Sequence, residues 1–150
     1  MIARIHKSMQ EKDKGFTLIE LLVVMIIIGI LAAIAIPVFL NQRTKAQDSA
    51  TKADVSTIGK EVATFYVDNT GGAALAITSG RYVLTPTGGT AIDLGRASDN
   101  VAIGGQTITG PSGWTVCLTN SQPNTKAFSY SQVGGLQQGA TCSAAGAVVP

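Results

Sequence analysis

Residues 15–20, GFTLIE, lead directly into residues 21–40, LLVVMIIIGILAAIAIPVFL, a run without any charged side chain. At a rise of about 1.5 Å per residue, a helix of about 20 residues spans the roughly 30 Å hydrocarbon core of a bilayer. The carboxylate of Glu20 stands at the entrance to this run, where an ionised group costs roughly 2.5–3.5 kcal/mol on insertion scales. The sequence therefore predicts a membrane-spanning helix whose acidic first turn needs a partner or a purpose.

The segment before the apolar run is basic. Residues 1–15 hold four basic and two acidic side chains, and residues 16–150 are balanced at seven of each. This neutral remainder argues against strong nonspecific binding to nucleic acid, which depends on phosphate neutralisation. The single histidine, His6, also lies in the leading segment. Its position lowers the expectation of a histidine-dependent catalyst or a zinc site in the rest of the chain.

The charges that flank the apolar run bear on its orientation in the membrane. Lys12 and Lys14 precede the run, and positively charged flanks tend to stay cytoplasmic, which places the residues after the run outside. Arg43 and Lys45 follow it on the far side and weaken this asymmetry. The balance still favours a cytoplasmic N-terminus.

The place of cleavage decides whether the apolar run stays in the mature protein. A conventional signal peptide ends its apolar core with a small-x-small site, and residues 32–35, AAIA, could mimic one. However, these residues lie inside the continuing run, whereas Gly15 precedes it. Cleavage after Gly15 would leave the run as the first helix of the mature chain.

Residues 14–20, KGFTLIE, followed by a long apolar helix, resemble the N-terminus of type IV prepilins with their class III signal peptide. The resemblance covers about residues 12–45, together with the position of the C-terminal cysteines. It implies that a prepilin peptidase cuts between Gly15 and Phe16 and that the new amine of Phe16 is N-methylated. Glu20 then becomes the fifth residue of the mature chain, as in the family.

The resemblance also implies a role for Glu20 in assembly. In the family, the N-terminal amine of an incoming subunit, here that of Phe16, is thought to neutralise this glutamate on a neighbour. Pairing would compensate two charges that are costly alone in lipid, and it would set the axial register of a filament. The alternative is a Glu20 that extends to the cytoplasmic headgroups from near the helix end.

Gly29 and Pro37 interrupt the apolar run. A proline inside a helix removes a hydrogen bond and costs roughly 3 kcal/mol, and a glycine adds up to about 1 kcal/mol. Residues 29–37 are therefore the predicted weak section of the helix. This section can be a tolerated kink, and the resemblance implies in addition that it loses helicity in filaments and lends them extensibility.

Past Pro37 the helix is predicted to continue to about residue 66, and residues 68–72, DNTGG, stop it. Val55, Ile58, Val62 and Phe65 form an apolar stripe on one helix face, which we expect to cover a sheet rather than to bind a ligand.

The remaining residues change to short β-like runs between turns. Candidate strands are residues 81–84, 101–103, 106–109, 114–119 and 127–131. Gly104 and Gly105 indicate a two-residue hairpin. Residues 114–118 alternate in polarity and suit the centre of the sheet, and Phe128 and Tyr130 share a strand face for packing. Residues 75–99 are expected to form an exposed connection with at most a short strand.

Two cysteines, Cys117 and Cys142, follow the membrane-spanning run. Outside the cytoplasm an isolated pair is typical of a disulfide, worth about 3.5 kcal/mol in the chain-entropy model. In a reducing compartment the same pair would be two buried thiols. The predicted topology favours the disulfide.

The chain carries few marks of other functions. Walker-type loops, Cys-x-x-Cys pairs and metal-spaced histidines are absent, so we expect no cofactor, no metal and no catalysis. Asp93 and Asp99 bracket a loop, but calcium takes six to eight oxygen ligands, and solvated loop aspartates explain them better. The N-terminus also resembles that of secretion pseudopilins, which typically carry a calcium-binding loop near the C-terminus. The present sequence has no clear acidic counterpart of that loop.

The fold class that follows is α+β, with a long N-terminal helix packed on a C-terminal antiparallel sheet. Residues 1–15 form a cleaved leader, residues 16–66 the long helix with a transmembrane and filament-core segment at 16–40, and residues 67–150 the globular head.

By resemblance, the chain is a major structural subunit of a type IV pilus. It would be a single-pass membrane precursor and then part of an extracellular filament. Its expected partners are other pilin subunits, the prepilin peptidase, an assembly ATPase and a platform protein, and a surface or DNA ligand stays unidentified. The alternatives are a pseudopilin of a type II secretion or competence system, and a minor tip pilin acting as a binding module. A membrane-anchored enzyme is disfavoured because the sequence shows no nucleophile–base or metal constellation.

Overall fold

The computed structural model describes residues 15–150, so the leader before Gly15, including Lys12 and Lys14, lies outside the described residues. The chain divides into two compact units at Leu40 and Asn41. In the first unit the described residues form the beginning of α2 (Leu18–Asp68), a single α-helix of 51 residues that contains Pro37. The predicted long helix is therefore confirmed, and it ends two residues later than expected.

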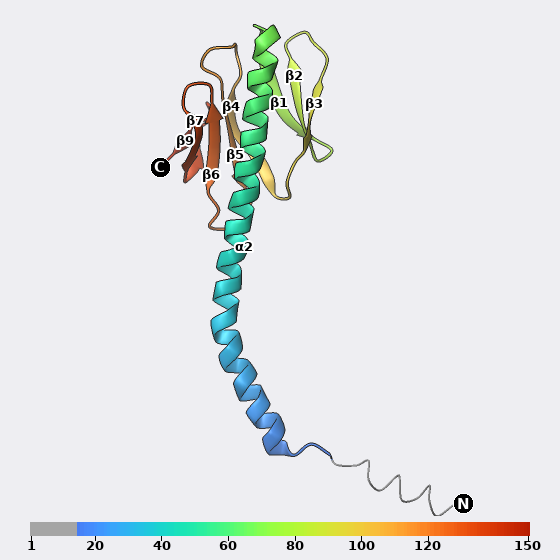
Figure 1. Ribbon diagram of the computed structural model, residues 1–150, viewed down its shortest axis with the longest axis vertical. Helices are drawn as coiled ribbons and strands as arrows, with labels where there is room; N and C mark the ends of the chain where they lie inside the picture. Colours follow the sequence, from blue (N-terminus) through green and yellow to red (C-terminus); the bar gives the residue numbers. More distant parts are fainter. Residues whose placement is uncertain (1–14) are drawn as a thin grey trace, which may run out of the picture. The chain divides into compact units, whose positions relative to one another are not determined.

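The second unit, which we call the head, contains the remainder of α2 and all the strands. A three-stranded antiparallel sheet has the order β1 (Ala73–Thr78), β2 (Arg81–Pro86), β3 (Ile92–Arg96). A four-stranded sheet follows in the order β4 (Val101–Thr107), β5 (Thr115–Asn120), β6 (Ala127–Ser131), β7 (Gly135–Gly139). Figure 1 shows the two sheets on either side of the head portion of α2. The fold is α+β, as the sequence predicts.

The core of the head lies between α2 and the two sheets. Val55, Ile58 and Val62 are buried, and Phe65 packs against them in part, so the predicted stripe is confirmed as the buried helix face. The sheets contribute the other buried side chains: Leu75, Tyr82, Leu84, Ile108, Trp114, Val116, Leu118 and Phe128. Tyr130 packs against the same cluster, which confirms packing as the role of the Phe128–Tyr130 face.

The expectation of an exposed connection over residues 75–99 is wrong. This segment forms most of the three-stranded sheet and buries Leu75, Tyr82 and Leu84 in the core. The β1–β2 pair keeps an unbroken register from Ala73 opposite Pro86 to Thr78 opposite Arg81. The alanine-rich sequence of β1 gives a weak strand signal, and tertiary pairing overrides that local preference.

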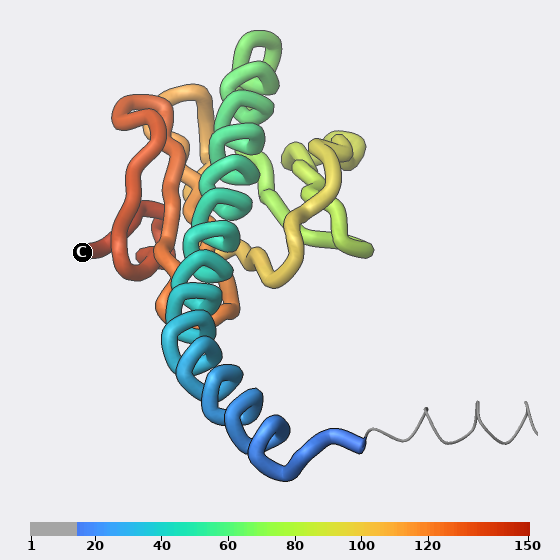
Figure 2. The backbone as a smooth tube through the Cα atoms, turned by 60° about the horizontal axis from the view of Figure 1, so that its bottom comes forward, coloured from blue at the N-terminus to red at the C-terminus, as the bar shows by residue number. Residues whose placement is uncertain are grey.

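The two sheets meet along β1 and β4. The amide of Ala73 donates to the carbonyl of Ile108 at 2.7 Å. The side-chain amide of Gln106 then bonds both backbone groups of Leu75: its Oε1 accepts from the amide at 2.7 Å and its Nε2 donates to the carbonyl at 2.8 Å. A side chain thus takes the place of a strand backbone at this seam. Figure 2 shows the backbone of the three-stranded sheet, in green to yellow, and that of the four-stranded sheet, in orange to red, on the two sides of the head portion of α2.

The predicted hairpin at Gly104 and Gly105 is also wrong. Both residues lie inside β4, where the register with β5 shifts between Ile103 and Gly105. A Cβ on Gly104 would lie 2.6 Å from Sγ of Cys142, and one on Gly105 would lie 2.0 Å from the carbonyl oxygen of Ser143. The glycines therefore allow the C-terminal segment to lie close to a bulged strand, a role distinct from making a turn.

The C-terminal segment forms a small two-stranded sheet of β8 (Thr141–Cys142) and β9 (Val148–Val149). The disulfide between Cys117 and Cys142 joins it to β5, with the two Cα atoms 5.9 Å apart. Val116 and Leu118, the neighbours of Cys117 in β5, belong to the core cluster. Because side chains alternate between the faces of a strand, the C-terminal segment lies on the sheet face opposite α2.

Candidate assembly site at the start of the long helix

Phe16 and Thr17 lie immediately before α2, and Glu20 lies in its first turn. The amide and the Oγ1 hydroxyl of Thr17 both donate to Oε2 of Glu20, at 2.9 and 2.8 Å, and the amide of Glu20 donates to Oγ1 of Thr17 at 3.2 Å. This reciprocal pattern is a capping box, which satisfies backbone donors that a helix start leaves unpaired.

The capping role of Thr17 is an addition to the residues predicted from the sequence. The signal was present as Thr-x-x-Glu immediately before an apolar run, the usual pattern of a capping box. Its presence gives Glu20 a local role as well as the proposed intermolecular one. The cap uses Oε2 of the carboxylate, and no described residue donates to Oε1.

The surroundings of Glu20 are apolar. Phe16, Ile19, Val23 and Val24 line a shallow groove beside the carboxylate. No cation of residues 15–150 pairs with Glu20, because the ion pair found there is that of Arg81 with Asp93. The structure thus places Phe16 just before the helix and Glu20 in its first turn, where both line the same groove.

The side chains of the following apolar run are exposed in the single chain. The large hydrophobic residues from Phe16 to Leu40 all expose about half or more of their surface, with Phe16 at 79%. A window of this helix reaches a mean hydropathy of 3.1 with none of it buried. Of the described helices, this one is long and apolar enough to cross a membrane. Such a surface needs a cover of lipid or of other subunits.

The head holds a second polar cluster that the sequence analysis did not find. Asp54 of α2 accepts from the hydroxyl of Tyr82 at 2.8 Å, and from the amide and hydroxyl of Ser98, both at 2.9 Å. Burial, and then the hydrogen bond to Asp54, raise the pKa of the Tyr82 phenol. The cluster ties α2 to β2 and to the loop after β3, so its evident role is structural.

The disulfide predicted from Cys117 and Cys142 is confirmed.

The two aspartates considered as calcium ligands, Asp93 and Asp99, have different surroundings. Asp93 bonds Nε of Arg81 through Oδ2 and the amide of Gly95 through Oδ1. These contacts and the guanidinium charge lower the pKa of the Asp93 carboxyl. Asp99 lies in the next loop, beside Arg96 and Ser98, and no group of three metal-binding side chains occurs within the described part of the chain.

Comparison with known proteins agrees with the features of the first turn. Residues 11–36 match the family model of the prokaryotic N-terminal methylation motif. The type IV major fimbrial protein FimA of Dichelobacter nodosus is 43% identical over 60 residues, which are 40% of this chain and 38% of that protein. No solved structure matches this chain.

Two other relatives extend the comparison. The fimbrial protein EcpC of Eikenella corrodens is 37% identical over 82 residues, 50% of this chain and 54% of that protein. The type II secretion system core protein G of Pseudomonas aeruginosa is 35% identical over 60 residues, 40% of this chain and 42% of that protein. The chain thus spans about half or less of the length of these relatives.

Proposed function

The chain belongs to the type IV pilin family, and from this premise we propose that it is a major structural subunit of a surface filament, anchored in the membrane before assembly. The proposal rests on the occurrence of two features in the same segment, an exposed apolar helix and an available carboxylate oxygen. The apolar helix is uncovered in the single chain, and one carboxylate oxygen of Glu20 is left unused by the local cap.

The proposed sequence of events begins with the precursor in the membrane. With a cytoplasmic N-terminus, lipid covers residues 16–40 and the head lies outside. A prepilin peptidase then cuts between Gly15 and Phe16. Before the cut the nitrogen of Phe16 is a neutral amide, and after it an amine whose ordinary pKa lies near 7.7–8.0. Cleavage therefore creates the cation, and N-methylation of Phe16 keeps its charge.

Assembly then replaces lipid by protein around the apolar helix. The amine of Phe16 on an incoming subunit approaches Glu20 of a subunit already in the filament and uses the carboxylate oxygen that Thr17 does not. In an apolar surround an unpaired charge is costly, so the pair favours docking at one register. The chain itself performs no catalysis in this scheme. An assembly ATPase and a platform protein would supply the work and the guidance.

Variants of the capping box test this proposal. Glu20→Gln keeps an acceptor for the cap, because glutamine also serves at this position, but it removes the negative charge. Thr17→Val removes the cap and leaves the charge. We expect Glu20→Gln to be cleaved and held in the membrane at normal levels while sheared surface filaments fall sharply.

The matched variant separates assembly from folding of the helix. Thr17→Val should lower the stability of the first turn by about 1 kcal/mol and still form filaments. Normal filament yield from Glu20→Gln would contradict the role of the carboxylate. Equal loss from both variants would show that the cap, and not the charge, is what assembly needs.

A pseudopilin of a type II secretion or competence system is the second candidate, favoured by the likeness to core protein G. A major pilin should be the main component of filaments sheared from cells, whereas a pseudopilin or a minor tip pilin should be scarce there. Loss of protein secretion, with surface filaments unchanged, on deletion of the gene would favour the pseudopilin.

A further inference from the structure

We infer that three basic side chains at the end of the head where α2 enters it, Arg43, Lys45 and Lys126, bind anionic phospholipid headgroups on the outer leaflet while the subunit is held in the membrane. We call these three residues the basic collar. The inference rests on the proposed function for the membrane-held stage. It concerns basic residues on the outer side of the membrane span, where Arg43 and Lys45 weaken the charge asymmetry that predicts the orientation of the helix.

Arg43 and Lys45 lie within reach of the headgroup layer by their position along α2. The apolar run ends at Leu40, and the helix continues without interruption through both residues. At 1.5 Å per residue, their Cα atoms lie roughly 5 and 8 Å along the axis beyond that of Leu40. The polar layer on one side of a bilayer is about 5–8 Å thick. Both cations therefore fall at the depth of the phosphates.

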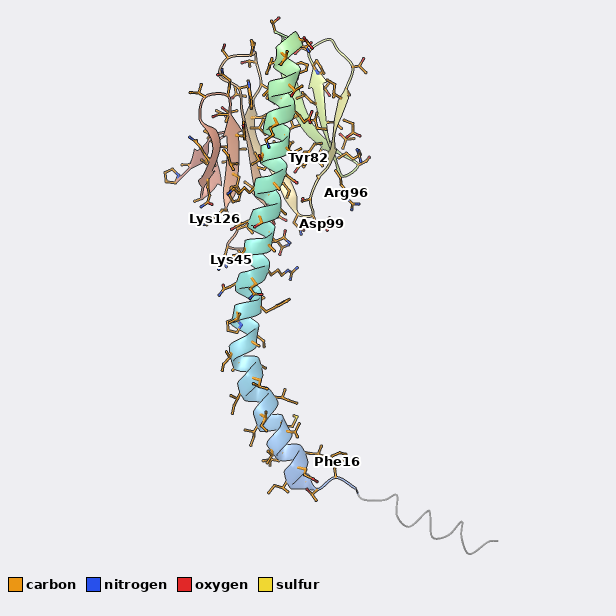
Figure 3. All side chains as sticks on the ribbon, in the orientation of Figure 1. Phe16, Lys45, Tyr82, Arg96, Asp99 and Lys126 are labelled. Carbon is orange, nitrogen blue, oxygen red and sulfur yellow. A yellow bond between two sulfur atoms is a disulfide. The ribbon has the colours of Figure 1, made fainter. Side chains whose placement is uncertain are left out.

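Lys126 comes from the loop between β5 and β6 and is fixed beside the same part of α2. Its amide donates to Oδ1 of Asp48 at 2.8 Å, and Asp48 follows Lys45 by three residues, less than one helical turn. The side chain of Asn120, at the start of the loop, donates to Oε1 of Gln47 at 3.0 Å. Figure 3 shows Lys45 and Lys126 at the same end of the head.

Two carboxylates of the head portion of α2 accept hydrogen bonds from groups outside the collar side chains. Asp48 accepts from the Lys126 amide, and Asp54 accepts from Tyr82 and Ser98. The ion pair among residues 15–150 is that of Arg81 with Asp93, and it includes none of the collar residues. Within residues 15–150, no ion pair joins Arg43, Lys45 or Lys126 to a carboxylate.

The charge of the collar is local to one end of the head. The acidic residues Glu61 and Asp68 lie on the last turns of α2, far along the helix from Lys45. Arg96, at the end of β3, and Asp99, in the loop that follows, add one charge of each sign at the end of the head where Figure 3 labels Lys126. Residues 41–150 carry seven basic and six acidic side chains in total. The head thus has little net charge but an uneven distribution, which suits binding to a planar anionic surface in one orientation.

A lipid partner explains why cations stand on the outer side of the span. Each Lys or Arg near an anionic membrane surface strengthens binding about fivefold, and three together give about a hundredfold in the limit of independent contacts. The effect is screened by salt, with a Debye length of about 10 Å at 0.1 M. The collar would hold the head down against the leaflet until extraction into a filament releases it.

Hydrogen exchange of the full mature chain in bilayer nanodiscs tests the inference. The discs contain either phosphatidylcholine alone or phosphatidylcholine with phosphatidylglycerol. We expect the amides of residues 121–126 to exchange up to about a hundredfold more slowly in the anionic discs, and high salt to remove the difference. Lys126→Gln should reduce this protection about fivefold, and Arg43→Gln with Lys45→Gln should remove most of the remainder.

Lys60→Gln is the matched control, because it removes one exposed cation from the same helix about 22 Å along its axis from Lys45. It should leave the protection unchanged. Equal exchange in both kinds of disc, with the protein inserted, would overturn the collar and leave the proposed function standing. Protection that grows with the protein-to-lipid ratio, regardless of lipid charge, would also overturn it, because the partner would then be a second copy. Failure to insert into either disc would contradict the proposed function itself.

Discussion

Gly59 of α2 faces the aromatic ring of Tyr130 in β6 so closely that a Cβ on Gly59 would lie 2.3 Å from Cγ of the tyrosine. Tyr130 in turn stacks on Trp114, with ring centroids 6.0 Å apart and planes inclined by 7°. The glycine therefore sets how near the helix comes to the sheet, and the two rings fill the space beside it.

Gly59→Ala should destabilise the head although alanine is the better helix former. The helix gains up to about 1 kcal/mol from propensity, but the added methyl forces the Tyr130 ring to move, and overpacking a core costs about 1–3 kcal/mol. Urea unfolding followed by Trp114 fluorescence measures the balance. Ala63→Gly, on the exposed side of the same helix, measures the difference in helix propensity between alanine and glycine without a change in core packing. A net gain in stability from Gly59→Ala would show that Tyr130 moves freely.

Replacing Cys142 by serine should lower the free energy of unfolding of the head by about 2–5 kcal/mol. Membrane insertion should persist, because the inserting segment lies far upstream. We expect limited proteolysis to cut first within residues 140–150, since the disulfide joins this segment to β5. Unchanged resistance to both protease and urea would show that backbone contacts alone hold the segment.

Tyr82 should give the head an alkaline limit of stability. The pKa of its phenol is raised in the folded state, chiefly by burial and then by the hydrogen bond to Asp54, while the unfolded chain titrates near pH 10. Above that pH the folded state binds more protons than the unfolded state, so stability falls as pH rises. Below it the contribution is fully present.

The matched variant for this prediction is Tyr82→Phe. It should lower stability at neutral pH by about 1–3 kcal/mol, because Asp54 loses a donor, and it should also flatten the decline above pH 10. Urea midpoints measured from pH 7 to pH 11 for both proteins check it. Parallel curves would show that other groups cause the alkaline loss.

Gly15→Leu should leave the full-length precursor in the membrane. The expected scissile bond follows Gly15, and a side chain there would obstruct the close approach of a peptidase to the backbone. Mass spectrometry of the unaltered protein should find methylated Phe16 at the N-terminus. An N-terminus within residues 32–36 would instead indicate a conventional signal peptidase and would remove the apolar helix from the filament.

Pro37→Ala should stiffen filaments. The substitution restores a backbone donor and removes a clash inside α2, so residues 29–37 should keep their helix under load. Pulling on single filaments should show less extension before rupture than in the unaltered protein. Ala35→Ser, nearby in the same run, is a control for altered packing. An unchanged extension would place the compliant section elsewhere.

Patterns of regular period were the most predictable parts of the molecule. The apolar run and the stripe of Val55, Ile58 and Val62 specify the long helix and its buried face, because a period near 3.6 is repeated over many turns. The strand at residues 81–84 was predicted and lies within β2, but β1 and β3 were missed. β1 is rich in alanine and β3 contains Gly95, so neither has a strong local signal. Gly104 and Gly105 were misread because their use depends on Cys142, which only the fold brings near.

The same distinction between local patterns and long-range contacts applies to the candidate site. Phe16 and Glu20 were identifiable because their spacing from each other and from the apolar run lies within one short segment. The cap made by Thr17 was available in the same segment as Thr-x-x-Glu. By contrast, the contacts of Asp54 with Tyr82 and Ser98 join residues 28 and 44 positions apart, and no local pattern announces them.

The side chain of Gln106, bonded to both backbone groups of Leu75, has a consequence for a chain that polymerises as proposed. Strand edges with free donors and acceptors invite pairing with other chains, and a filament holds its heads at very high local concentration. By bonding Leu75, Gln106 occupies one donor and one acceptor at the edge where β1 meets β4. A head that lost this amide would present them to its neighbours, and ordered polymerisation through the helix would compete with disordered β-aggregation.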